Sequence, residues 1–118
     1  MRCSVRTVGL IVRTVDIAED GRATNIVSLD IRGISSMTDY FVILTAESSR
    51  QIKALMEQMS MGLKSLGVRV NHKEGHPNDG WILLDFGDFI VHIFSPEKRD
   101  YYLLESAWPQ AKELVRIF

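Results

Sequence analysis

The stretch GWILLDFGDFIVHIF, residues 80–94, decides the fold. Two apolar runs, residues 81–86 and 89–94, flank the pair Gly87-Asp88. A two-residue Gly-Asp link between β-rich runs is typical of a hairpin, because glycine accepts the positive φ that a primed turn requires. Centring the turn on this pair places Phe86 opposite Phe89 and, at the far end, Trp81 opposite Phe94.

The side-chain period of two divides this hairpin into two faces. The first face is apolar throughout and is expected to pack on the core; its residues are Ile82, Leu84, Phe86, Phe89, Val91 and Ile93. The second face is mixed; its residues are Trp81, Leu83, Asp85, Ile90, His92 and Phe94. Two interpretations of the mixed face stay open. Either a second layer of helix covers it, or Trp81 and Phe94 form an aromatic docking patch with a polar edge at Asp85 and His92.

Length and composition indicate one globular domain. A chain of 118 residues buries about two-thirds of its unfolded-chain surface without metal or disulfide staples. The net charge of −1 argues against binding to nucleic acid that is driven mainly by electrostatic attraction. It is compatible with binding to a protein that itself sits on nucleic acid. Cys3 has no second cysteine to pair with, which favours a reducing compartment, and no apolar run has the length of a membrane span. We therefore expect a cytoplasmic protein without membrane association.

Periodicity and capping signals predict the remaining elements. In chain order they are a helix over about 5–19, strands over 25–31 and 40–45, a helix from Ser48 to Gly67, a short strand or extended segment at 68–71, a polar loop at 72–79, and, after the hairpin, a helix from Pro96. Ser48 and Gln51 form a capping box, in which each side chain accepts from the other's backbone N–H. The expected fold class is α/β: a single domain over 1–118, with a mixed sheet of about five strands flanked by helices, a core over 8–110 and a helical tail over 111–118.

Residues able to bind a metal or catalyse a reaction do not assemble into a recognisable site. Asp-Phe-Gly at 85–87 spells the metal-binding signature of protein kinases, but the chain lacks a glycine-rich loop and a His-Arg-Asp stretch. Asp85 and Asp88 as paired metal ligands are disfavoured, because one lies on the mixed face and the other in the turn. His72 and His76, with a glutamate between them, lack a third ligand at a recognised spacing. We expect no cofactor, no metal and no enzymatic activity.

Five stretches follow one another in a characteristic order: SLDIRGISSMTDYFVI at 28–43, Ser-Ser-Arg at 48–50, Glu-Gly at 74–75, the hairpin WILLDFGDFIVHIF, and then Arg99, Tyr101, Leu104-Glu105 and Trp108. Together they resemble the ribosomal silencing factor family, also called Iojap-like, over about residues 8–110. The chain departs from the family pattern at Ala46-Glu47, where a Gly-Thr pair is usual, and at Gly80, where an acidic residue is common.

The resemblance implies a fold related to nucleotidyltransferases but without their catalytic residues. It implies binding to the large ribosomal subunit at ribosomal protein fourteen, on the face that meets the small subunit. Occupying that face would sterically block subunit joining and repress translation under nutrient limitation. It also implies a homodimer off the ribosome, and it assigns part of the ribosomal contact to the positions that Trp81 and Phe86 occupy here.

The expected partner-binding residues are therefore Trp81, Phe86 and Phe94, with Asp85, Asp88, His92 and Tyr101 in support. Trp81 and Phe86 fall on opposite faces of the hairpin, so the way in which both reach one partner stays open. Sequence-specific nucleic-acid binding is not expected. Two alternatives remain: a residual nucleotidyltransferase that uses Asp85 and Asp88, and a dimeric assembly module that associates through methionine or aromatic stripes.

Overall fold

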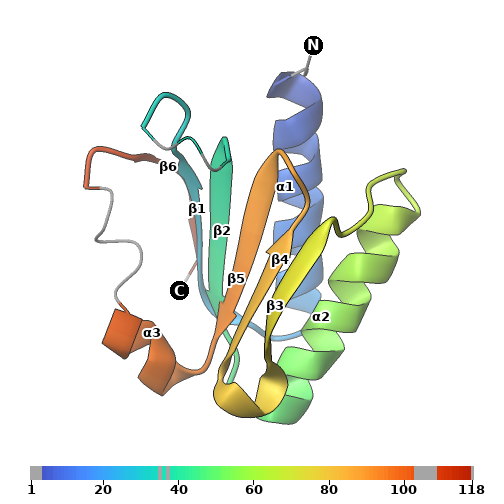
Figure 1. Cartoon of the computed structure of the whole chain (residues 1–118), viewed down its shortest axis with the longest axis vertical. Helices are drawn as coiled ribbons and strands as arrows, with labels where there is room; N and C mark the ends of the chain where they lie inside the picture. Colours follow the sequence, from blue (N-terminus) through green and yellow to red (C-terminus); the bar gives the residue numbers. More distant parts are fainter. Residues whose placement is uncertain (1–3, 35, 37, 103–108, 118) are drawn as a thin grey trace.

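A mixed β-sheet runs through the computed structural model, which describes residues 4–34, 36, 38–102 and 109–117 (Figure 1). The elements are α1 (Ser4–Asp20), β1 (Thr24–Asp30), β2 (Tyr40–Thr45), α2 (Ser49–Lys64), β3 (His72–His76), the 3-10 helix η1 (Pro77–Asp79), β4 (Trp81–Asp85), β5 (Phe89–Phe94), α3 (Pro96–Tyr102) and β6 (Lys112–Ile117). The strand order is β3-β4-β5-β2-β1-β6, with β2 and β5 parallel and all other neighbours antiparallel. The predicted α/β class is confirmed, and the described residues form six strands rather than about five.

The β4–β5 hairpin has the predicted register. Trp81 pairs with Phe94 and Asp85 with Ile90. The backbone N–H of Phe86 donates to the carbonyl of Phe89 at 3.0 Å, which closes a two-residue turn. Gly87, the first residue of that turn, has a φ of +93°, a conformation that side chains disfavour. The local signal therefore sufficed to place every pair of this hairpin.

The two faces of the sheet build two apolar cores. Helices α1 and α2 cover one face (Figure 1), and all six residues of the apolar hairpin face join this core. The opposite face carries a smaller core that includes Phe41, Leu83, Ile90 and Phe94, with Trp81 packed against it. Helix α3 lies on this second side (Figure 1). Strand β2 sits between the two cores and is buried at all six positions, as its continuous apolar sequence predicts.

Helix α3 is fixed to the second side of the sheet by a buried arginine. One terminal nitrogen of Arg99 donates to the carbonyl of Asn25 at 2.7 Å and to Oγ1 of Thr45 at 2.9 Å. The helix begins at Pro96, as predicted, and the hydroxyl of Ser95 accepts from the backbone N–H of Lys98. These contacts place α3 beside the ends of β1 and β2.

The start of α2 is capped in a way that also ties α1 to it. The hydroxyl of Ser48 accepts from the backbone N–H of Gln51 at 3.1 Å, as predicted. The amide oxygen of Gln51, however, accepts from the N–H of Glu47 at 2.7 Å, one residue before the expected partner. The amide nitrogen of Gln51 donates to the carbonyls of Gly21 and Arg22 in the link after α1. The side chain therefore joins two segments as well as capping one.

Both edges of the sheet were mispredicted. Residues 72–79, expected to form a polar loop, hold the edge strand β3, which pairs antiparallel with β4, and the short helix η1. The expected helical tail over 111–118 is wrong, because Lys112–Ile117 forms β6, antiparallel to β1. Val115 and Ile117 pack on the larger core at the two-residue spacing of a strand. Leu104 and Trp108 lie outside the described residues. No helix of the described part has the length and apolarity needed to cross a membrane.

Candidate functional site

Three flat rings stack on the second face of the hairpin, and we call this group the Trp81 stack: Trp81, His92 and Phe94. The ring centroids of Trp81 lie 6.4 Å from His92 and 6.3 Å from Phe94, with interplanar angles of 8° and 13°. His92 and Phe94 are 5.9 Å apart at 6°. The edge of Phe41 meets His92 at 4.9 Å and 90°. The predicted closeness of Trp81, Phe94 and His92 is therefore confirmed.

The stack leaves one ring partly open to solvent. Trp81 is half-buried, whereas His92 and Phe94 are buried. The docking patch expected from Trp81 and Phe94 is thus reduced to Trp81, with Phe94 as its support. The indole Nε1–H of Trp81 donates to Nδ1 of His92 at 3.4 Å, which fixes the orientation of the ring. A large aromatic side chain that is held rigidly loses little entropy on binding, so it suits an interface anchor.

The imidazole of His92 is neutral because it is buried. Its exposed fraction is 5%, and burial lowers the pKa of His92 to about 4. An indole nitrogen only donates, so Nδ1 of His92 accepts and the ring proton sits on Nε2. Nε2 is buried and has no hydrogen-bond partner in the described part of the chain. The site therefore contains a weakly basic group that resists protonation.

Acidification should destabilise the fold through His92. The unfolded chain takes up a proton near pH 6.5, whereas the folded chain does so only near pH 4, so stability falls as the pH drops between these values. The expected loss between pH 7 and pH 4 is about 3 kcal/mol in the free energy of unfolding. Urea denaturation followed at both pH values measures it.

The matched variants are His92→Gln and His72→Gln, since His72 is exposed on the edge strand. His92→Gln should lose most of this pH dependence, and His72→Gln should retain it. An unchanged pH dependence in His92→Gln would contradict the assignment.

Phe86 lies on the other side of the sheet from Trp81. It belongs to the core under α1 and α2, with an exposed fraction of 6%, and its ring stacks on Phe89 at 5.1 Å. The structure therefore does not bring Phe86 and Trp81 together. The opposite faces predicted for the two residues are confirmed.

The two aspartates of the hairpin hold its turn. Oδ1 of Asp85 accepts from the N–H of Gly87 at 2.7 Å, and Oδ2 of Asp88 accepts from the hydroxyl of Thr7 at 3.5 Å. The hydroxyl of Thr38 donates to the carbonyl of Gly87 at 3.0 Å. The carboxylates are therefore engaged with different segments and stabilise the turn.

The histidines of β3 also make local contacts. Nε2 of His72 lies 3.3 Å from a carboxylate oxygen of Glu74, and Nδ1 of His76 accepts from the N–H of Asn78 at the start of η1. Within the described ranges, no three His, Cys, Asp or Glu side chains gather in a way that could hold a metal ion. Cys3 and the side chain of Tyr101 lie outside the described part.

Sequence reasoning missed two contacts of the Trp81 stack. The edge contact of Phe41 with His92 follows from the parallel pairing of β2 with β5, which places Phe41 beside Ile90. The pairing of distant strands leaves no local signal in the chain. The hydrogen bond from Trp81 to His92 joins diagonal neighbours of the hairpin, a geometry that the correct register already contained.

A family described as "Ribosomal silencing factor during starvation" matches residues 6–117. Among curated relatives, a ribosomal silencing factor of Bacillus subtilis is 38% identical over 93 residues, covering 79% of this chain and 79% of the relative. One from Halalkalibacterium halodurans is 32% identical over 102 residues, covering 86% and 87%. The chloroplastic protein Iojap of Zea mays is 41% identical over 95 residues, covering 80% of this chain and 41% of the longer plant protein.

Two crystal structures have the same fold. A Chromobacterium violaceum protein superposes with a TM-score of 0.80 at 34% identity, covering 85% of this chain and 83% of that one. A Bacillus halodurans protein gives a TM-score of 0.77 at 33% identity, covering 90% and 98%. At these identities and coverages, the similarity shows that most of this chain has the fold of the two crystal structures.

Proposed function

Because this chain belongs to the family of ribosomal silencing factors, whose role is named for starvation, we propose that it binds the large ribosomal subunit and blocks joining of the small subunit. The match over residues 6–117 is the observation that carries the proposal. The family consists of regulators and not of enzymes, so the residual nucleotidyltransferase is set aside. The consequence in the cell would be repressed translation when nutrients are short.

The proposed partner on the large subunit is ribosomal protein fourteen. A near-neutral chain, with a net charge of −1, suits docking on a protein better than docking on nucleic acid alone. Steric blocking needs no chemistry, only a rigid body held at the subunit interface. A sheet covered by helices, with the half-buried ring of Trp81 packed against Phe94, provides such a body.

Trp81 is the proposed direct contact with the ribosomal protein. Its half-buried ring has Phe94 and His92 behind it, so a partner meets a surface that is already ordered. Preorganisation lowers the entropy cost of association. Phe94 then contributes by supporting the indole, and His92 by accepting its N–H.

Phe86 is proposed to act through the turn. Its ring is buried against Phe89, and its N–H closes the Gly87-Asp88 turn, which the side chains of Asp85, Asp88 and Thr38 also hold. Packing of Phe86 would thereby fix the position of the turn, whose backbone can face the partner. This arrangement lets Trp81 and Phe86 affect one partner from opposite faces.

The oligomeric state and the location are part of the same proposal. We infer a homodimer away from the ribosome and a cytoplasmic location, where ribosomes work. The outer strands β3 and β6 end the six-stranded sheet on either side. An open strand edge presents unpaired backbone N–H and C=O groups, so it is a suitable surface for a second copy.

Co-sedimentation with separated subunits tests the binding proposal. The protein should travel with the large subunit in a sucrose gradient and should stay at the top when only small subunits are present. Equal binding to both subunits, or binding to neither at micromolar concentration, would overturn it. Large subunits reconstituted without ribosomal protein fourteen should bind the protein much more weakly.

A further inference from the structure

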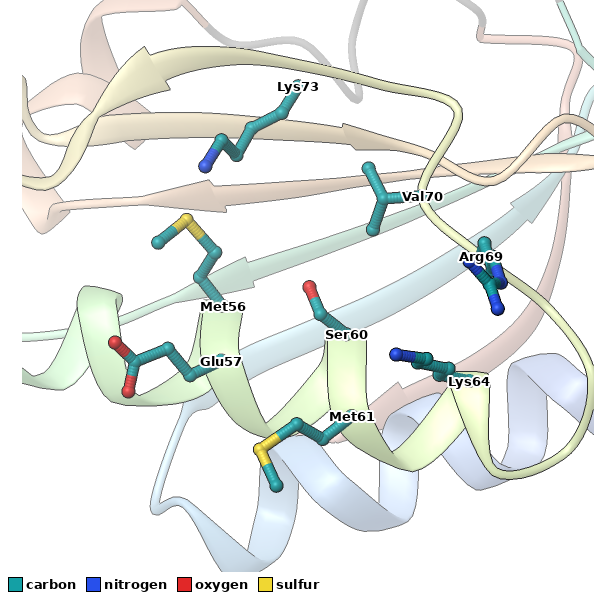
Figure 2. A pocket seen from close by; sticks show the side chains of 8 residues that line it. All are labelled: Met56, Glu57, Ser60, Met61, Lys64, Arg69, Val70 and Lys73. Carbon is teal, nitrogen blue, oxygen red and sulfur yellow. The ribbon is translucent and has the colours of Figure 1, made fainter.

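A groove runs between α2 and the edge strand β3, and we call it the α2–β3 groove (Figure 2). It consists of two adjoining hollows of about 560 and 410 Å³ that share Met56 and Lys73. Its floor includes Met56 and Val70, which are partly buried against the core. A flexible thioether and an aliphatic side chain form an adaptable apolar base rather than a shaped cavity.

The walls of the groove are strongly basic. Five cationic side chains line it: Arg50, Lys53, Lys64, Arg69 and Lys73. All five are exposed, and no ion pair engages any of them within the described ranges. Glu57 is the one carboxylate among the lining residues. A chain with a net charge of −1 therefore carries a local excess of about four positive charges on one face.

The fold creates this concentration of charge. Arg50, Lys53 and Lys64 share a side of α2, next to the helix's buried stripe, whereas Arg69 and Lys73 come from the connection after α2 and from β3. Figure 2 shows Lys64 and Arg69 at one end of the larger hollow, with Lys73 toward the other end. Like charges that line one groove repel each other, and an anion between them would relieve the repulsion.

We propose that the α2–β3 groove binds the phosphodiester backbone of RNA on the large ribosomal subunit, independently of its sequence. The inference rests on the proposed function, because it takes the ribosome as the source of the RNA. A groove lined by positive side chains is typical of proteins that bind phosphate backbones. From Arg50 to Lys64 the helix extends about 20 Å, which suits a row of phosphates better than the phosphates of one nucleotide.

The position of the groove is compatible with a contact at Trp81. The groove lies on the face that α2 covers, and the Trp81 stack lies on the opposite face. The groove also reaches Ile82 on β4, the strand that Trp81 begins. A ribosomal surface that encloses the β3 edge can therefore contact Trp81 through its protein and the groove through its RNA phosphates.

The test compares two triple variants of equal net charge. The groove variant is Lys64→Gln, Arg69→Gln, Lys73→Gln, and the control is Arg13→Gln, Arg22→Gln, Lys112→Gln, which removes exposed cations elsewhere. Affinities for purified large subunits and for an RNA duplex of about 16 base pairs are measured over a range of salt concentrations. Circular dichroism and urea unfolding check that each variant is folded.

The groove variant should bind both probes at least about tenfold more weakly at low salt, and the slope of log affinity against log salt should decrease by about 2 to 3. The control should keep the slope of the parent. An unchanged slope in the groove variant would overturn the proposal, as would a parent that binds the duplex no better than the groove variant does.

The two probes distinguish a failure of the groove proposal from a failure of the proposed function. A parent that binds the RNA duplex through the groove but does not bind large subunits would refute the ribosomal source, and with it the proposed function. If the groove variant binds large subunits normally at every salt concentration, the RNA-binding role of the groove is refuted and the proposed function is not. Groove-dependent binding of AMP or inorganic phosphate, without any for the duplex, would identify a small-anion site and overturn the RNA assignment.

Discussion

Replacing Trp81 by alanine should weaken binding to the large ribosomal subunit by about 30-fold or more, which corresponds to about 2 kcal/mol. The indole is the partly exposed member of a stack whose other members are buried, so truncation removes the proposed contact. The loss should appear mainly as faster dissociation. A binding titration with purified large subunits, combined with a dissociation chase, measures both quantities.

The matched control for this prediction is Leu114→Ala. Leu114 is an apolar side chain with an exposed fraction of 37%, and it lies on β6 at the other edge of the sheet. Its removal should leave the affinity within about twofold of the parent. Urea unfolding must show that Trp81→Ala is folded at the assay temperature, because the variant also loses its contacts with Phe94 and His92. A folded Trp81→Ala protein with the parental affinity would remove Trp81 from the contact.

Phe86→Ala should show a different signature. The ring is buried, so truncation should lower the free energy of unfolding by about 3 to 5 kcal/mol. Phe86→Leu retains most of the apolar volume and should recover most of both stability and binding. If Phe86→Leu is stable and yet binds as weakly as Trp81→Ala, Phe86 must touch the partner directly.

Gly75→Ala should disrupt the edge of the sheet at β3. Gly75 has a φ of +87°, and a Cβ at this position would collide with the backbone carbonyl of Trp81 on the neighbouring strand. Neither backbone can move without breaking the β3–β4 pairing. We expect a loss of at least about 2 kcal/mol in the free energy of unfolding. Hydrogen exchange should show lost protection at the amides that join β3 to β4.

Gly9→Ala is the control for Gly75→Ala. Gly9 lies within α1, has an exposed position, and a Cβ there would meet no atom within 4 Å. Alanine is the better helix former, so this variant should gain about 0.5 to 1 kcal/mol. Opposite signs for the two glycine substitutions would support the backbone argument. A Gly75→Ala protein with parental stability and intact exchange protection would contradict it.

The central hairpin could be predicted fully because the residues that determine it are adjacent in the sequence. A Gly-Asp turn between two apolar runs sets the register, and the period of two then sorts the faces. The pairs from Trp81–Phe94 to Asp85–Ile90 all occur as predicted. The burial of β2 on both faces was equally readable, since six consecutive apolar or small residues leave no polar face.

The two edge strands could not be read in the same way. Strand β3, His-Lys-Glu-Gly-His, is exposed at every position and has no apolar alternation, as expected of an edge. Strand β6 was mistaken for a helix because Leu114, Val115 and Phe118 recur at helical spacing. In the structure, Val115 and Ile117 pack on the core instead, because β6 pairs with β1, some 85 residues earlier in the chain. Such tertiary pairing overrides local propensity.

The candidate site was predictable only in part. Trp81, Phe94 and His92 meet as the register requires, but His92 and Phe94 are buried in a core that includes residues outside the hairpin, such as Phe41. The α2–β3 groove was not foreseen at all. Its basic residues are spread over 50–73 in the sequence, and they form one surface only because β3 is a strand that lies beside α2. The net charge of the chain conceals this local excess.

The most direct measurement of the central claim is the rate of subunit joining. Purified large subunits are incubated with the protein, small subunits are added, and light scattering follows the formation of joined ribosomes. We predict that saturating protein suppresses joining, that Leu114→Ala suppresses it equally, and that Trp81→Ala requires about 30-fold more protein for the same effect. Joining at the normal rate and extent, with the protein shown to be bound to the large subunit, would contradict the steric blocking proposed here.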